Sequence, residues 1–250
     1  MERVQIYAYG KTEIGKVLEV NDDATHLEMM GPYYVMIVAD GQNGCKGSVS
    51  IGMLATSLMA NYLRKIIRPD TSINEIKAQM DAGFFLCAQS FLAINAIDER
   101  FADIYASLSC LILHKDTLQM VIASVGNTEI QLYRDKMFSR LSEVHSEAYD
   151  DLMKGILLEE EFYISPKRGL VTSAIGKIPI TKMDIRSGTL RQGDIVFLVT
   201  DGIYRHVTPN EILKCCYQAG NIDGGIDAAL NLGNERGGLD NMAIIGCTID

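Results

Sequence analysis

The stretch IVFLVTDG, from Ile195 to Gly202, consists of five apolar residues and then a threonine, an aspartate and a glycine. A second stretch, YVMIVADG from Tyr34 to Gly41, also ends in an aspartate and a glycine. Each apolar run predicts a buried strand. A carboxylate at the end of such a strand is costly unless a cation lies beside it, and glycine lets the backbone approach a ligand closely. The two stretches therefore predict two carboxylates, Asp40 and Asp201, that neighbouring strands bring to one place.

Two further segments carry acidic and amide side chains beside predicted strands. Asn21-Asp22-Asp23 follows a segment near the start of the chain, and Asp240-Asn241 leads into the last apolar run. Oxygen ligands from separate segments, with water completing the shell, are what Mg²⁺ and Mn²⁺ prefer. An Asp-Gly pair alone is also an ordinary turn. The prediction of a metal site therefore depends on all four segments together.

Length and composition bound the possible classes of protein. The chain has 250 residues, 48% of them hydrophobic, and no long Gly/Ser linker, which fits a single domain over residues 1–250. A net charge of −9 makes nucleic acid and anionic membranes unfavourable partners. The six cysteines, Cys45 included, form no CxxC pair and are expected to be buried free thiols. Without a signal-peptide core or a membrane-length apolar run, the expected location is cytoplasmic.

The order of apolar patterns predicts an α+β fold. Strand-like runs cover 4–9, 33–39, 108–114, 118–125, 129–134, 195–200 and 242–247, several of them joined by short polar turns typical of antiparallel hairpins. Helical periodicity or capping signals predict helices over 51–63 and 73–94, after Thr208, and over 226–232. Because strands and helices come in blocks, helices packed on antiparallel sheets are expected.

Several phosphatase and hydrolase signatures are absent from the sequence. Neither aspartate is part of a DxDG motif, since Val38 and Val199 stand two residues before them. No cysteine has an arginine six residues later, and no GxxxxGK[ST], HExxH or GxSxG motif occurs. The four histidines are dispersed and do not form a zinc set. These absences exclude the kinds of site that those motifs mark.

The order of the segments resembles that of the metal-dependent serine/threonine protein phosphatases of type 2C, in their compact bacterial form. Six pieces carry the resemblance, in the family's order. VNDDA (20–24) is similar to NEDA, VADGQNG (38–44) to ADGMGG, and LVTSAIG (170–176) to ITRALG. ASVGNTEIQLYRDKMFSRLSEVHS (123–146) is similar to A-N-V-G-D-S-R and its basic hairpin, GDIVFLVTDGIYRHVTPNEI (193–212) to GD-x-LLL-x-SDGL-x-D, and GGLDNMAII (237–245) to GS-x-DN-x-T.

The resemblance implies a fold and a metal centre. The fold has two central antiparallel β-sheets, packed as a sandwich and flanked by helix pairs in four α-β-β-α layers. Between the sheets lie two ions of Mn²⁺ or Mg²⁺. The residues that the family pattern assigns to the metal centre are Asp22, Asp23, Asp40, Gly41 through its carbonyl, Asp201 and Asp240. Asp23, Asp40, Asp201 and Asp240 are the implied catalytic residues, and Asn241 supports them.

The implied reaction is hydrolysis of phosphoserine and phosphothreonine in phosphorylated proteins by a water that bridges the two ions. Two such ions lower the pKa of the bridging water, which explains the absence of a side-chain nucleophile. The substrates would be targets of a serine/threonine kinase, and the protein would be a monomer. Residues 147–170 would form a mobile flap that shapes substrate choice.

The chain departs from the family pattern at two positions. Leu18 replaces the phosphate-binding arginine, and Lys16 is the expected substitute, as a point charge without a bidentate fork. Asn127 replaces the aspartate that holds a third ion in bacterial members, so a third ion is not expected. His145 resembles the family histidine near the site and is predicted to contact substrate, with a structural histidine as the alternative. These departures keep open a second hypothesis, a pseudophosphatase that binds or regulates phosphoproteins.

Overall fold

The computed structural model describes residues 4–42, 50–97, 99–101, 103–177 and 182–250, and these form two antiparallel sheets of five strands each. The first sheet has the order β1 (Ile6–Glu13), β10 (Met242–Ile249), β9 (Ile195–Val199), β6 (Glu129–Arg134) and β7 (Met137–Arg140). The second has the order β2 (Asp23–Met30), β3 (Tyr33–Gln42), β4 (Tyr105–His114), β5 (Gln119–Val125) and β8 (Asp184–Thr189). The predicted α+β class with antiparallel sheets is confirmed.

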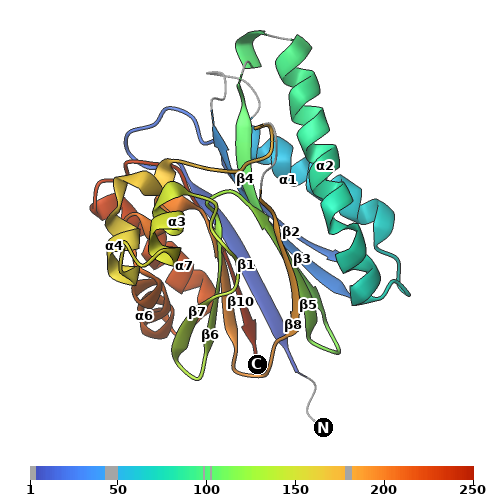
Figure 1. Cartoon of the computed structure of the whole chain (residues 1–250). Coiled ribbons are helices and arrows are strands. Elements are labelled where there is room, and N and C mark those ends of the chain that lie inside the picture. The colour runs from blue at the N-terminus through green and yellow to red at the C-terminus, as the bar shows by residue number, and fades with distance from the viewer. Residues whose placement is uncertain (1–3, 43–49, 98, 102, 178–181) are drawn as a thin grey trace.

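Alternating side chains of the strands divide the core into three apolar layers. In β3, Val35 and Ile37 face the helices α1 (Ile51–Ile66) and α2 (Ile73–Ile97), whereas Met36 and Val38 lie between the sheets. On the other side, α6 (Pro209–Ala219) and α7 (Ile222–Glu235) pack on β9 and β10. Figure 1 shows α1 and α2 on one side of the sandwich and α6 and α7 on the other. This is the predicted four-layer α-β-β-α sandwich.

The capping signals in the sequence mark real helix starts. Glu75 accepts hydrogen bonds from the backbone N–H and hydroxyl of Ser72 at 2.7 Å, at the start of α2. Thr208 and Glu211 form the capping box of α6, with proline at the first helical position. Both arrangements satisfy backbone N–H groups that a helix start leaves without partners. Gly220, with φ at 75°, ends α6 in the left-handed conformation that favours glycine.

Helix α2 is 25 residues long and, by length and composition alone, apolar enough to cross a membrane. In this fold one of its faces packs on the second sheet, where Met80, Phe84, Cys87 and Phe91 are buried. It therefore has the position of a core helix.

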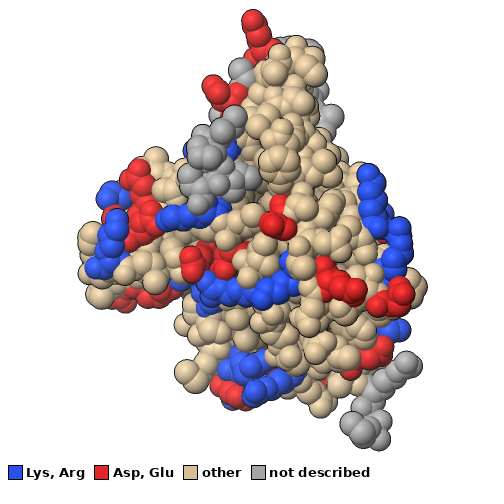
Figure 2. Space-filling view, turned by 45° about the vertical axis from the view of Figure 1, so that its right-hand side comes forward, with Lys and Arg blue, Asp and Glu red and all other residues tan. Residues whose placement is uncertain are grey.

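The face of the molecule in Figure 2 carries basic and acidic side chains intermixed, not one contiguous basic surface.

The patterns missed short or polar elements. Strand β2 has only three of its eight residues buried, and β8 is a polar edge strand, so neither shows a clear apolar alternation. Within the predicted flap, residues 147–170, lie α3 (Glu147–Met153), α4 (Glu159–Ile164) and the 3₁₀ turn η2 (Pro166–Gly169). A further turn, η1 (Glu99–Phe101), follows α2. The mobility of the flap and the single-domain assignment stay predictions.

The described cysteines have no disulfide partner. Cys87, Cys110, Cys216 and Cys247 are buried, as expected for structural free thiols, whereas Cys215 is only partly buried. Cys45 lies outside the described residues.

Candidate active site

Strand pairing brings the four predicted catalytic carboxylates to one end of the sandwich. Asp23 is the direct partner of Asp40 across β2 and β3. Asp201 begins the short helix α5 (Asp201–Tyr204) directly after β9, and Asp240 stands just before β10, which pairs with β9. The Thr200 hydroxyl donates to Asp23 Oδ2 at 2.6 Å, and this hydrogen bond connects the two sheets at the site. Two carboxylates therefore come from each sheet.

Burial makes the ionised state of these carboxylates costly. Asp23, Asp40 and Asp201 have only 6%, 4% and 5% of their surface exposed. Burial, together with the negative charge of Asp201 and Asp240, raises the pKa of Asp23 well above its usual range. Burial and the neighbouring Asp23 raise the pKa of Asp40 in the same way. The pKa of Asp201 rises to about 6, through burial and Asp240, although Arg205 opposes the shift.

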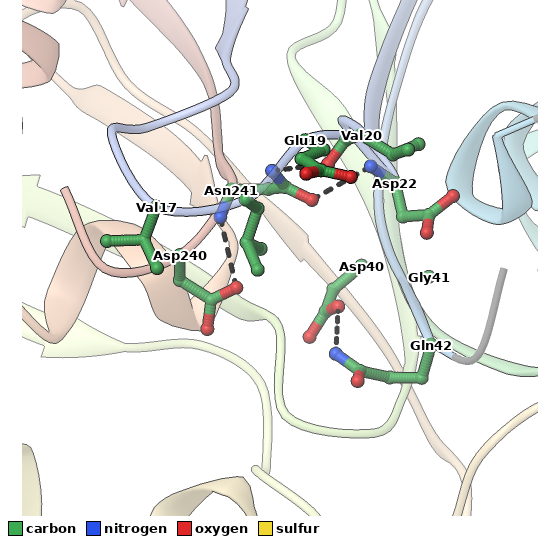
Figure 3. A pocket seen from close by; sticks show the side chains of 10 residues that line it. Val17, Glu19, Val20, Asp22, Asp40, Gly41, Gln42, Asp240 and Asn241 are labelled. Carbon is green, nitrogen blue, oxygen red and sulfur yellow. Dashed lines mark hydrogen bonds between the residues drawn. The ribbon is translucent and has the colours of Figure 1, made fainter. Parts of the chain in front are cut away.

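An open cavity of about 440 Å³ is lined by two of the four carboxylates, Asp40 and Asp240, while Asp23 and Asp201 are not part of its lining. Figure 3 shows Asp40 and Asp240 on opposite sides of it. The residues that line the cavity come from the N-terminal segment, the end of β3 and the start of β10: Val17, Leu18, Glu19, Val20, Asp22, Asp40, Gly41, Gln42, Asp240 and Asn241. The cavity is open, and its lining combines apolar side chains with acidic and amide groups.

Asn241 holds the N-terminal segment against the site. Its amide nitrogen donates to the Ile14 and Val20 carbonyls at 2.8 and 3.0 Å, and its Oδ1 accepts from the Asp22 N–H at 2.8 Å. The Asp22 carboxylate in turn accepts from the Ile51 N–H at 3.0 Å, at the start of α1, and Figure 3 shows it directed away from Asp40. In this structure Asp22 therefore caps a helix, and its role as a metal ligand stays a prediction.

Glycine is required where β3 meets α1. The Gly41 and Gly52 N–H groups both donate to the Asp22 carbonyl, at 3.1 and 2.9 Å. A Cβ on Gly41 would lie within 2.6 Å of the Ile51 side chain. The close approach leaves the backbone next to Asp40 within reach of a ligand.

The donor set suits hydrated divalent cations. Among the described residues, no three His, Cys, Asp or Glu side chains are gathered closely enough to hold a metal ion by themselves. Mg²⁺ and similar hard cations do not require such a cluster, because they keep several waters and bind through one or two carboxylates. Cations would also offset the cost of burying Asp23, Asp40 and Asp201. The residues present therefore fit such ions.

His145 lies inside the protein, away from the cavity lining. It is 2% exposed, its Nδ1 accepts from the Gly126 N–H at 3.0 Å, and its carbonyl accepts from the Thr172 N–H. Burial and the nearby Lys182 lower its pKa to about 4. These contacts are those of a neutral structural histidine. His145 does not line the cavity, and its contact with substrate stays a prediction.

His145 should make the protein sensitive to acid. Since its pKa in the folded protein is about 4, below the ordinary value of 6.5, the unfolded chain binds the extra proton first as pH falls. The stability from neutral His145 is complete above pH 6.5 and is lost progressively toward pH 4, up to about 3 kcal/mol. Urea unfolding at several pH values should show the difference between the wild type and His145→Asn shrinking as pH falls. A difference that is constant from pH 7 to 4 would contradict this assignment.

The comparison with known families agrees with this geometry. Residues 15–218 match the family model described as Protein phosphatase 2C. The chain belongs to the protein phosphatase 2C family. The chain is 24% identical over 235 residues to "Protein phosphatase PhpP" of Streptococcus pneumoniae, which covers 93% of each protein.

Solved structures of similar proteins share the fold of this family member. The S. agalactiae serine/threonine phosphatase has a TM-score of 0.85 at 20% identity, over 98% of this chain and 100% of that one. The catalytic domain of the phosphatase PstP, solved in complex with two manganese ions, has a TM-score of 0.76 at 17% identity, over 98% and 99%. At these identities the likeness confirms the two-sheet sandwich of the 2C family and nothing finer.

The structure shows the surroundings of the residues at which this 2C family member departs from the family pattern. Leu18 lines the cavity and is 42% exposed. Asn127 is buried, its Oδ1 accepts from the Ser107 hydroxyl at 2.6 Å, and its carbonyl accepts from the Tyr204 hydroxyl at 2.5 Å. The Lys16 N–H donates to the Gly238 carbonyl at 2.7 Å, so Lys16 runs beside the segment that carries Asp240.

Arg205 is the site residue that sequence reasoning missed. Its Nη1 lies 3.0 Å from Asp240 Oδ2, which makes an ion pair inside the acidic site. The pattern SDGL-x-D, matched to TDGIYR at residues 200–205, shows an aspartate in the family where this chain has Arg205. That reversal of charge is the signal that could have identified it.

Proposed function

We propose that this chain is a metal-dependent serine/threonine protein phosphatase, a phosphoric monoester hydrolase. The observation that carries the proposal is that Asp23, Asp40, Asp201 and Asp240, from both sheets, lie at one end of the sandwich, where Asp40 and Asp240 line an open cavity. Membership of the 2C family gives this arrangement its chemistry. Relatives of similar length are named as protein phosphatases, and several as serine/threonine phosphatases.

The ions would be two Mn²⁺ or Mg²⁺, as the manganese complex of the similar PstP domain supports. Asp40, the Gly41 carbonyl, Asp201 and Asp240 would hold them. Asp23 and Asp22 would order the water on them, which requires the Asp22 carboxylate to leave the Ile51 N–H from which it accepts here. When bound, such ions lower the pKa of water and offset charge on phosphoryl oxygens. The chain's own contribution is to keep four carboxylates fixed in a partly dry site, with Thr200 and Asn241 holding Asp23 and the Asp22 backbone in place.

The substrates would be phosphoserine and phosphothreonine in proteins modified by a serine/threonine kinase. The open cavity admits a phosphorylated side chain that projects from a protein surface. We place the protein in the cytoplasm as a monomer, with neither nucleic acid nor membrane as partner. A third ion is left out because Asn127 offers a neutral, already bonded amide in place of a carboxylate.

The test is hydrolysis of an aryl phosphate and of a phosphothreonine peptide by purified protein with Mn²⁺, with Mg²⁺ and without metal. We expect turnover with Mn²⁺ or Mg²⁺ that disappears on chelation and returns when the ion is added back. Metal binding by calorimetry without turnover would favour the pseudophosphatase. The complete set of carboxylates favours the enzyme.

A further inference from the structure

The cavity has an excess of negative charge. Glu19, Asp22, Asp40 and Asp240 line it, and none of the described lining residues is basic. A phosphate monoester is itself anionic, and proteins usually hold it with arginine, whose planar fork matches two phosphate oxygens. Leu18 offers neither charge nor a hydrogen-bond donor. Apart from bound ions, any cationic contact to the phosphate must therefore come from a residue outside this lining.

Arg205 is not one of the residues that line the cavity, but it contacts one of them, Asp240. It caps the C-terminal end of α5, four residues after Asp201, and its Nη1 donates to Asp240 Oδ2 at 3.0 Å. The side chain is 32% exposed. A guanidinium has five N–H donors, and the bond to Asp240 is the one side-chain hydrogen bond that it makes to the described residues. The remaining N–H groups are not used by the described residues, and the side chain is partly open to solvent.

The ion pair with Asp240 gives Arg205 a fixed place. Asp240 is itself held, because its Oδ1 accepts from the Asn241 N–H at 3.0 Å. A guanidinium positioned in this way loses less conformational entropy on binding phosphate than a free surface lysine does. Lys16, the substitute suggested by the sequence, makes its described hydrogen bond through the backbone.

We propose that Arg205 binds the phosphoryl group of the substrate, in place of the arginine that Leu18 has displaced. The proposal rests on the phosphatase function proposed above. Asp240, which lines the cavity, holds the guanidinium in place, and the unused N–H groups donate to phosphoryl oxygens. The phosphate contact thus comes from α5, beside Asp201, and not from the N-terminal segment.

The experiment measures inorganic phosphate as a competitive inhibitor of Mn²⁺-dependent aryl phosphate hydrolysis. Loss of a charge-assisted hydrogen bond in Arg205→Gln should raise the Ki of phosphate and the KM by roughly tenfold or more, with a smaller change in kcat. Arg205→Lys should keep part of the affinity. Leu18→Arg in the Arg205→Gln background should restore much of it. Lys16→Ala should leave Ki near the wild-type value, and Arg64→Gln, in an exposed ion pair with Glu28, is the control for loss of an arginine.

Several results would overturn the proposal. One is an unchanged Ki in a folded, active Arg205→Gln protein, and another is a rise in Ki on Lys16→Ala that Arg205→Gln does not show. If Arg205 only holds Asp240 in place, kcat and the calorimetric Mn²⁺ affinity will change while the phosphate Ki does not, which also rejects it. Absence of turnover in the wild type would instead reject the phosphatase function. In that case Arg205 is tested by calorimetric binding of phosphate in the presence of Mn²⁺. A roughly tenfold loss of phosphate affinity in Arg205→Gln would support the proposal, and an unchanged affinity would reject it.

Discussion

Asp40→Asn should lower Mn²⁺-dependent phosphatase activity by roughly a hundredfold or more, since even groups that only support a metal ligand cost ten- to a hundredfold. Asp40 is buried in the acidic cluster, 4% exposed, lines the cavity and lies opposite Asp23 on the neighbouring strand. The substitution keeps the shape and the acceptor for the Gln42 amide, which lies 2.9 Å from Oδ1. What it removes is the charge that would hold an ion.

The same substitution should stabilise the metal-free protein. Burial and the negative charges of Asp23 and Asp201 raise the pKa of Asp40, so its ionised form is costly when no cation is present. Removing the charge should therefore increase the free energy of unfolding at pH 7, on the order of 1 kcal/mol. Activity and metal-free stability are expected to move in opposite directions, which a general folding defect does not produce.

Thermal unfolding with and without Mn²⁺, beside turnover, checks both effects. The wild type should melt higher with Mn²⁺ because a ligand of the native state stabilises it, and Asp40→Asn should lose most of that increase. The matched control is Asp227→Asn, which removes one carboxylate from an exposed ion pair with Lys11. Normal turnover and a normal Mn²⁺ shift in Asp40→Asn would exclude Asp40 from the metal centre.

The sequence predicts the layers of this fold better than its small elements. The apolar runs that end at Asp40 and Asp201 are long and rich in β-branched residues, so β3 and β9 are recognisable from their period and burial. Strand β2 begins at Asp23 itself and has only three of its eight residues buried, and α5 is a single turn of four residues. Such elements form through tertiary contacts, which local pattern does not encode.

In the candidate active site, too, the sequence predicts what depends on local pattern and misses what depends on tertiary contacts. Aspartates that follow buried strands indicate cations, because an unpaired carboxylate is costly at the edge of a core. The ion pair between Arg205 and Asp240 joins residues 35 positions apart and depends on how α5 meets β10. The sequence likewise could not show that Asp22 caps α1 or that His145 is buried against Gly126, since both contacts arise from packing between elements.

The close packing of α5 against the start of β10 predicts a large loss of stability and turnover in Gly202→Ala. Gly202 follows Asp201, and a Cβ there would overlap the carbonyl oxygen of Asn241 and lie 3.3 Å from Asp240 Cβ. Because the obstacle is backbone, no side-chain rotation relieves it, and α5 must move away from the start of β10. We expect a loss of about 3 kcal/mol of stability and a fall in turnover of roughly a hundredfold, since Asp201, Asp240 and Arg205 would be displaced together.

The control is Gly169→Ala, at the end of η2, where an added Cβ meets no atom within 4 Å. It should melt and turn over like the wild type, while Gly202→Ala should show a lower melting temperature, a weaker Mn²⁺ shift and little activity. Adding Mn²⁺ should not restore the variant, because the defect is the separation of ligands and not the loss of one. A Gly202→Ala protein with wild-type stability and turnover would mean that α5 and β10 are not in contact, and the site as described would then be wrong.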